Sequence, residues 1–159
     1  MIVKILLSAA LLLLSSCSCE KQVAEKEERV MLINVLDKEL FDDCHIKGSY
    51  HVPFMDFDNP ESSPIEEFVK NLPKHTKMVI YCSNYLCSAS GEIAKKLNKM
   101  GFENVWAYEA GMAEWYQKGL PVSGACKQGY LFKQMNPPEK HSGDFKVVET
   151  SELKKMLAA

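Results

Sequence analysis

The segment that most constrains the fold is KMVIYC at residues 77–82, which is apolar throughout after its first residue. A strand with one face in water alternates apolar and polar residues, whereas a strand buried on both faces is a continuous apolar run. We therefore predict an inner strand of a sheet that is covered on both sides. The helix expected next, at residues 88–101, carries apolar residues on one face and ends at a glycine.

Short strands and helices alternate along much of the remaining chain. The other expected strands are residues 31–35, 49–53 and 104–109, and the other expected helices are residues 37–44, a helix that begins at Pro64, and residues 111–119. Such alternation predicts an α/β fold with a central parallel sheet and helices on both faces. In these folds, sites form where the carboxyl ends of the strands lead into helices, and Cys82 is expected at that end of the central strand.

The first residues are expected to direct export. Residues 1–16 contain one lysine, an apolar run too short to span a bilayer as a permanent helix, and then small residues, which predicts a signal peptide. The sequence LSSC ending at Cys17 resembles the bacterial lipobox, which implies lipidation of Cys17. This predicts an exported bacterial lipoprotein that its lipid anchors to a membrane, facing the periplasm or the cell exterior. The alternative is an ordinary cleaved signal with a coincidental cysteine.

The rest of the chain divides into three parts. Residues 17–29 are charged and without periodicity, as in a tether. Residues 30–123 form the predicted domain, and residues 124–159 an extension expected to pack on it. A chain of 159 residues suits one compact domain, and its net charge of −2 has no basic excess that would favour nucleic acid.

The cysteines point to a reactive centre. Of six, five remain if Cys17 is lipidated, so at least one thiol is free or pairs outside the chain. The backbone N–H groups of a tight loop after Cys82, together with the start of a helix, make a cradle for an anion. We therefore expect a lowered pKa and a raised reactivity for Cys82, with no metal or cofactor.

Three motifs in order resemble the rhodanese (sulfurtransferase) family: LINVLDKELFDDCHIKGSYHVP, VIYCSNYLCS and GFENVWAYEAGMAEWYQKGLPV. The resemblance covers nearly all of residues 30–123 and implies a rhodanese-like fold. It implies that Cys82 is the nucleophile, which takes sulfane sulfur from a small-molecule or protein-bound donor and passes it to a thiol or another acceptor. It further implies that the terminal sulfur is held by the backbone amides of Ser83, Asn84, Tyr85, Leu86, Cys87 and Ser88.

The chain departs from the family pattern in ways that bear on activity. Asn34 and Leu36 replace charged residues of the first motif, so an internal ion pair is missing. The 83–88 loop has no arginine or lysine, so thiosulfate is expected to be a poor donor. Tyr85 and Leu86 either form an apolar rim suited to an organic or protein-bound donor, or are covered by the extension.

The role of Cys87 stays open at this stage. It either acts as a resolving thiol that attacks a persulfide or sulfenic acid on Cys82, or packs as a small apolar residue. A zinc site is disfavoured because no second pair of ligands has standard spacing. The alternatives to a sulfurtransferase are thus a thiol-disulfide oxidoreductase using Cys82 and Cys87, and a catalytically weak binding module. Cys44, which replaces a family glycine, is either buried or bonded to Cys126.

The extension contains DFKVVETSELKKML, which resembles the strand and helix with which rhodanese domains usually begin. Those elements are missing before Met31. The hypothesis is a circular permutation, in which residues 144–158 supply the missing edge strand and its helix. The permutation hypothesis requires that residues 145–149 pair with the sheet as a strand.

Overall fold

The structure is a computed structural model, and it describes residues 29–56, 59, 61–137 and 143–158. The predicted signal peptide and Cys17 lie outside these residues. The elements in chain order are β1 (Met31–Asn34), α1 (Lys38–Asp43), β2 (Cys44–Ile46), β3 (Tyr50–His51), α2 (Pro64–Val69), β4 (Met78–Tyr81), α3 (Ala89–Lys99), β5 (Val105–Tyr108), α4 (Gly111–Gln117), β6 (Val122–Gly124), the 3-10 helix η1 (Gly129–Phe132), β7 (Lys146–Val147) and α5 (Thr150–Ala158). Among the described residues, no helix has the length and apolar character needed to cross a membrane.

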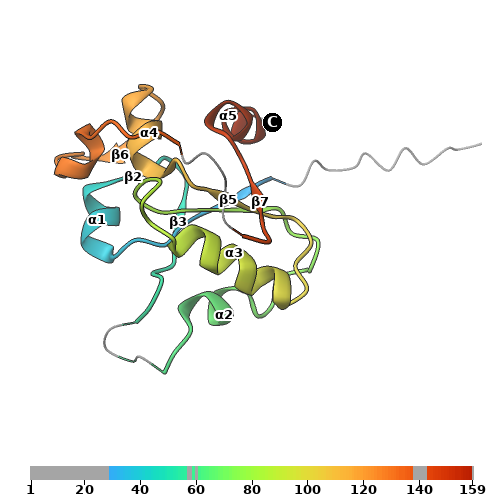
Figure 1. Ribbon diagram of the computed structural model, residues 1–159. Helices are drawn as coiled ribbons and strands as arrows, with labels where there is room; N and C mark the ends of the chain where they lie inside the picture. Colours follow the sequence, from blue (N-terminus) through green and yellow to red (C-terminus); the bar gives the residue numbers. More distant parts are fainter. Residues whose placement is uncertain (1–28, 57–58, 60, 138–142, 159) are drawn as a thin grey trace, which may run out of the picture.

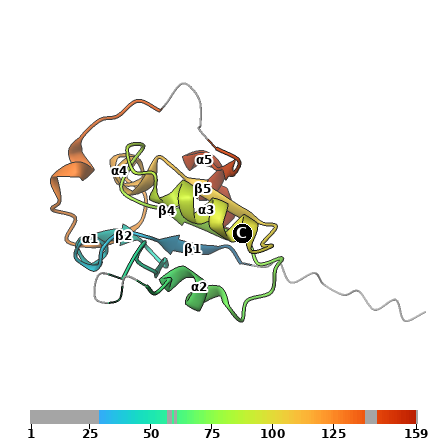
Figure 2. The same ribbon diagram turned by 60° about the horizontal axis from the view of Figure 1, so that its bottom comes forward.

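The main sheet has five parallel strands in the order β3-β1-β4-β5-β7, so β4 is the central strand, as the sequence predicts. Helices cover both faces, with α2 and α3 on one side and α4 and α5 on the other (Figure 1). In the turned view, α3 lies in front of the sheet with α2 beside it (Figure 2). The predicted α/β architecture is confirmed.

The apolar run of β4 is explained by two separate cores. Successive side chains of a strand point to opposite faces. Val79 and Tyr81 pack in the core beneath α4 and α5, whereas Met78 and Ile80 pack in the core beneath α2 and α3. All four are completely buried, which is why no position in this strand is charged.

A small antiparallel pair, β2 with β6, was not predicted from the sequence. It is short, and its residues, CHI and VSG, carry no strong strand pattern. A disulfide between Cys44 and Cys126 lies beside this pair and joins residues 82 positions apart. Of the two possibilities for Cys44, the structure therefore shows the disulfide.

The C-terminal segment pairs with the sheet. β7 runs parallel to β5, with Lys146 opposite Trp106 and Val147 opposite Ala107. The requirement of the permutation hypothesis is met, since this segment supplies an edge strand and a helix. The permutation itself stays a hypothesis.

Candidate active site

Cys82 follows the central strand directly. The strand ends at Tyr81, one residue earlier than predicted, and Cys82 is fully buried at the carboxyl edge of the sheet. Its sulfur lies 3.3 Å from the carbonyl oxygen of Cys87, so the loop between the two cysteines closes back on itself. Among the described cysteines, these two are the free thiols.

Helix α4 sets the orientation of the loop's first peptide groups. The N–H groups of Met112 and Ala113 donate to the carbonyl oxygens of Cys82 and Ser83, each over 2.9 Å. In a planar trans peptide the next N–H points away from that carbonyl. The amides of Ser83 and Asn84 are therefore turned toward the interior of the loop. There the Ser83 amide contacts the Cys87 sulfur and the Asn84 amide contacts the Cys82 sulfur.

The close approach of α4 to the loop depends on a glycine. Gly111 has a φ of +62°, and a Cβ built there would lie 2.7 Å from the carbonyl oxygen of Cys82 and 2.8 Å from the amide nitrogen of Asn84. Any side chain would push the loop away from the helix. The glycine turn that the sequence shows after β5 therefore positions the cysteine loop.

The amides around the sulfurs differ in part from those expected. Two come from the loop, and two more, from Ala89 and Ser90 at the start of α3, contact Cys87 and Cys82 respectively. The loop amides of Leu86 and Cys87 are instead bound by the side chain and the carbonyl of Asn84, over 3.0 Å each. The start of the following helix was expected to contribute to the cradle, but the amides predicted from the sequence were only those of residues 83–88 and not those of Ala89 and Ser90.

The charge sits on the sulfur that the sequence did not favour. The Cys82 side chain hydrogen-bonds to Cys87, and this bond together with burial raises the pKa of Cys82 well above its ordinary value. The same hydrogen bond, with amides of Ala89 and Ser83, lowers the pKa of Cys87 to about 6. The predicted lowering of the Cys82 pKa is thus wrong for the free pair. Cys87 is less buried and receives more donors, which favours the charged form of Cys87 over that of Cys82.

The remaining loop side chains point in different directions. The Tyr85 hydroxyl donates to the Glu114 carboxylate over 2.9 Å, and the Ser88 hydroxyl donates to Glu92 over 2.5 Å. Leu86 is 82% exposed, so the extension leaves it uncovered. Asn34 accepts a hydrogen bond from the Leu36 amide over 2.9 Å, which gives this uncharged replacement a local role in the turn after β1.

A small hollow in the described part of the chain includes two residues of the cysteine loop, although neither thiol lines it. A cavity of about 30 Å³ is lined by residues of the loop, α4 and the extension, among them Asn84, Tyr85, Glu114 and Lys133. Its lining places a cation of the extension beside a loop that has none of its own. Lys133 therefore belongs to the surroundings of the site, although it lies far from the loop in sequence.

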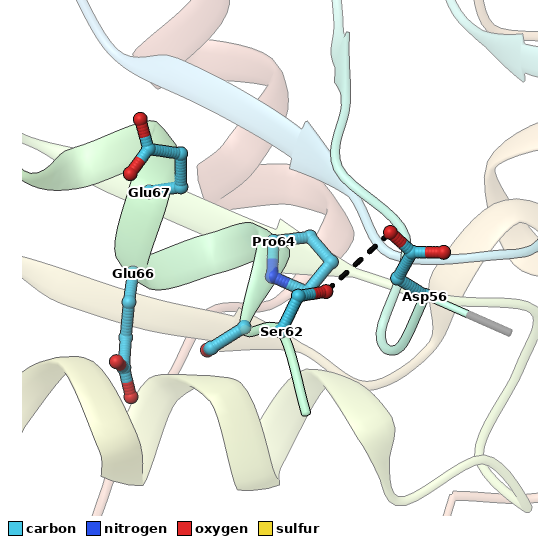
Figure 3. Close-up of a pocket in the computed structure, with 6 residues that line it drawn as sticks. Asp56, Ser62, Pro64, Glu66 and Glu67 are labelled. Atoms are coloured by element: carbon cyan, nitrogen blue, oxygen red, sulfur yellow. Dashed lines mark hydrogen bonds between the residues drawn. The ribbon is translucent and has the colours of Figure 1, made fainter. Parts of the chain in front are cut away.

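A larger hollow, of about 510 Å³, lies at the start of α2 and includes no residue of the cysteine loop (Figure 3). Its acidic residues are paired, since Lys96 bonds to Glu66 over 2.7 Å and Lys70 bonds to Glu67. Within the described part of the chain, no group of three or more His, Cys, Asp or Glu side chains is arranged to hold a metal ion.

A central strand that ends at a buried cysteine, and a loop whose amides surround that sulfur, define an α/β protein with a cysteine-loop reactive centre. Comparison with known proteins specifies the class. The family described as Rhodanese-like domain matches residues 19–118, which is more than half of the chain, and the chain belongs to this family. The resemblance seen in the motifs is confirmed.

Individual proteins similar to this chain agree with its assignment to the family. The chain is 33% identical over 81 residues to "Adenylyltransferase and sulfurtransferase uba4" of Sclerotinia sclerotiorum, but it spans only 17% of that protein's length. It is 20% identical over 104 residues to "Thiosulfate sulfurtransferase GlpE" of Vibrio cholerae, covering 65% of this chain and 89% of the relative. The solved structure of the BH2092 protein from Bacillus halodurans has a TM-score of 0.54 at 26% identity, covering 68% of this chain and 74% of that one.

Proposed function

We propose that this protein is a sulfurtransferase that carries sulfane sulfur on Cys82 as a persulfide. The observation that carries the proposal is a buried cysteine beside a second thiol, with four backbone amides, two from the loop and two from the start of α3, directed at the two sulfurs. Relatives named as sulfurtransferases belong to the same family and support the reaction class. No cofactor takes part in the proposed steps.

Loading begins with the thiol pair. The Cys87 thiolate accepts the proton of Cys82 through the hydrogen bond that joins them, and the Cys82 sulfur then attacks the outer sulfur of the donor. A bond forms between Cys82 and that sulfur, and the donor's sulfur–sulfur bond breaks, so the rest of the donor leaves as a thiolate. The product is Cys82–S–S⁻, whose charge lies among the amides.

Discharge reverses these roles. An acceptor thiolate attacks the outer sulfur of the persulfide, forms its own persulfide and releases Cys82 as a thiolate. That thiolate retakes the proton from Cys87, which restores the starting pair. Cys87 therefore acts in this proposal as the group that holds the proton between the two half-reactions.

The same pair supports a second candidate, a thiol-disulfide oxidoreductase. The contact between the two side chains supports an attack of the Cys87 sulfur on the inner sulfur of a persulfide on Cys82. That attack would release the outer sulfur as hydrosulfide and leave a Cys82–Cys87 disulfide, which a thiol reductant then opens. The third candidate, a binding module with little turnover, rests on Asn34 and Leu36 in place of charged residues.

The donor is proposed to be organic or protein-bound, with thiosulfate a poor substrate. Leu86 is an exposed residue of the loop, and its side chain offers an apolar contact that a donor with carbon atoms can use and a small inorganic anion cannot. The loop adds no cation, and Lys133 is the cation that the extension brings near it. An inorganic dianion would gain less from these groups than from a charged loop.

We also propose export and anchoring through Cys17. The disulfide between Cys44 and Cys126 supports an oxidising compartment, because disulfides of this kind are rare where thiols are kept reduced. The membrane contact would then be made by the lipid, with the domain held on the tether of residues 17–29.

Intact mass separates these functions. The purified domain is exposed to an organic persulfide donor, as wild type, as Cys82→Ser and as Cys87→Ser. Sulfur transfer predicts a gain of one sulfur atom that requires Cys82 and is slowed in Cys87→Ser. A loss of two hydrogens that requires both cysteines would instead support the oxidoreductase, and no change in mass would leave the binding module.

A further inference from the structure

A hydrogen-bonded chain links the C-terminal helix to the cysteine loop. The Tyr85 hydroxyl donates to Oε2 of Glu114 over 2.9 Å, and the Thr150 hydroxyl donates to Oε1 of Glu114 over 2.5 Å. Because the Thr150 proton is used in this way, the Tyr108 hydroxyl at 2.8 Å donates to Thr150. One carboxylate on α4 thus joins the loop after the central strand to the first residue of α5.

The charge states favour this arrangement at neutral pH. Burial alone would raise the pKa of the Glu114 carboxyl, but hydrogen bonds from Thr150 and Tyr85 and the charge of Lys118 outweigh it and lower that pKa. Burial and the neighbouring Glu114 raise the pKa of Tyr85, which therefore stays a donor. Thr150 is only 4% exposed, so water has little access to its side of the chain.

Tyr85 connects the Glu114 carboxylate to the part of the loop that faces the Cys82 sulfur. It follows Asn84 directly, and Asn84 supplies the amide that faces the Cys82 sulfur as well as the side chain that binds the Leu86 amide. The amides of α4 hold the start of the loop, and Glu114 holds its middle. Nearby, Gln117 donates to the carbonyls of Leu131 and Lys133 over 2.9 and 2.8 Å, which fixes the extension against the same helix.

We propose that Glu114 and Thr150 are positioning residues that hold the Cys82–Cys87 loop in its sulfur-binding form, so that the C-terminal strand and helix are part of the reactive centre. Thr150 lies outside the residues that match the family, so this is a feature of the chain's own extension. The inference rests on the proposed function only in calling the loop sulfur-binding. The hydrogen bonds exist whether or not sulfur is transferred, and their effect on the thiols is measured separately from sulfur transfer.

The plain alternative is that these hydroxyls merely attach α5 to the domain. Three variants separate the two roles. Thr150→Val removes the hydroxyl at nearly constant shape, and Thr150→Ser restores it. Leu153→Ala removes a completely buried side chain of α5 but leaves the hydrogen-bonded chain untouched.

Each variant of the full domain is alkylated with iodoacetamide across a pH series, with the modified cysteine identified by peptide mass, and is also unfolded in urea. With Thr150→Val, the pH midpoint for alkylation of Cys87 is expected to rise by roughly half a unit or more. The loop amides are then no longer held in the orientation in which they donate to the sulfur, so the thiolate is less stabilised. Thr150→Ser should keep the wild-type midpoint. Leu153→Ala should lower the urea midpoint and leave the alkylation midpoint of the folded protein unchanged.

The proposal is overturned if Thr150→Val behaves like Leu153→Ala, with lowered stability and an unchanged alkylation midpoint. It is also overturned if substitutions of Glu114 and of Thr150 leave the reactivity of both thiols unchanged. Failure of the proposed function looks different, since wild-type protein would then gain no sulfur from a persulfide donor while the alkylation midpoints still moved as described.

Discussion

Replacing Gly111 by alanine tests how the active loop is built. This glycine has a φ of +62°, and an added Cβ would come within 2.7 Å of Cys82 and Ser83 backbone atoms and 2.8 Å of the Asn84 nitrogen. These neighbours are backbone atoms, which yield less easily than the end of a flexible side chain. The loop must therefore move away from α4, and the two hydrogen bonds from Met112 and Ala113 must lengthen.

The cost in the free energy of unfolding has three components. A left-handed backbone costs alanine about 1 kcal/mol more than glycine. Forcing the loop aside adds about 1–3 kcal/mol of overpacking, and each weakened hydrogen bond about 1 kcal/mol. The expected loss is about 4–6 kcal/mol in the free energy of unfolding, which is a large share of the roughly 5–15 kcal/mol by which a typical domain is stable.

Gly119→Ala is a matched control. Gly119 has a φ of +65°, yet a Cβ there meets nothing within 4 Å. It therefore carries the backbone cost alone, about 1 kcal/mol. Urea unfolding of the two variants measures the difference that the contact with the loop makes.

The same variants test how the orientation of the loop amides affects the pKa of Cys87. Turning the Ser83 amide away from Cys87 removes one of the donors that lower the Cys87 pKa from 9.0 to about 6, so its alkylation midpoint should rise in Gly111→Ala and stay in place in Gly119→Ala. The reasoning is refuted if the two variants lose equal stability and keep the same alkylation midpoint. That result would mean that α4 neither presses on the loop nor orients its amides.

Three further predictions concern the thiols, the donor and the anchor. In wild type the Cys87 thiolate forms as pH rises through about 6; since the hydrogen bond from Cys82 is the largest cause of that lowered pKa, Cys82→Ala should move the alkylation midpoint upward. Leu86→Asp should slow transfer from a protein-bound donor by roughly tenfold or more, as expected when a leucine contact of ~1.5–3 kcal/mol is lost, with small donors unaffected in the same mass assay. Cys17→Ser should abolish labelling by a fatty acid and release the protein from membranes in cell fractionation, whereas labelling lost in Cys19→Ser but kept in Cys17→Ser would contradict the assignment.

The central place of β4 and the position of Cys82 after it were predicted from the sequence because both follow from local patterns. The apolar run of β4 marked the centre, and glycines marked the ends of the helices after it. The short pair β2–β6 was not readable, because its pairing partners are far apart in sequence and neither strand has an alternating pattern.

The distribution of charge between the two thiols was missed for a different reason. A cysteine in an anion cradle is expected to have a lowered pKa, but the sequence does not say which of two neighbouring sulfurs the amides favour. The hydrogen bond between the two side chains, with the complete burial of Cys82 and the partial burial of Cys87, favours the charge on Cys87. Likewise, Glu114 and Thr150 have no motif, and only their meeting beside Tyr85 reveals them.

The C-terminal segment is best understood from what its removal would expose. Without β7, β5 would be the edge of the sheet, and the Ala107 carbonyl that accepts from Val148 over 3.0 Å would lose its partner. The segment also fills both cores, since Phe145 packs against Gly91 of α3 while Leu153 is completely buried on the opposite face. A domain ending before β7 would thus have an open edge and two incomplete cores. Because the same segment delivers Thr150 to Glu114, its contributions to folding and to the cysteine loop cannot be separated by truncation, only by single side-chain changes.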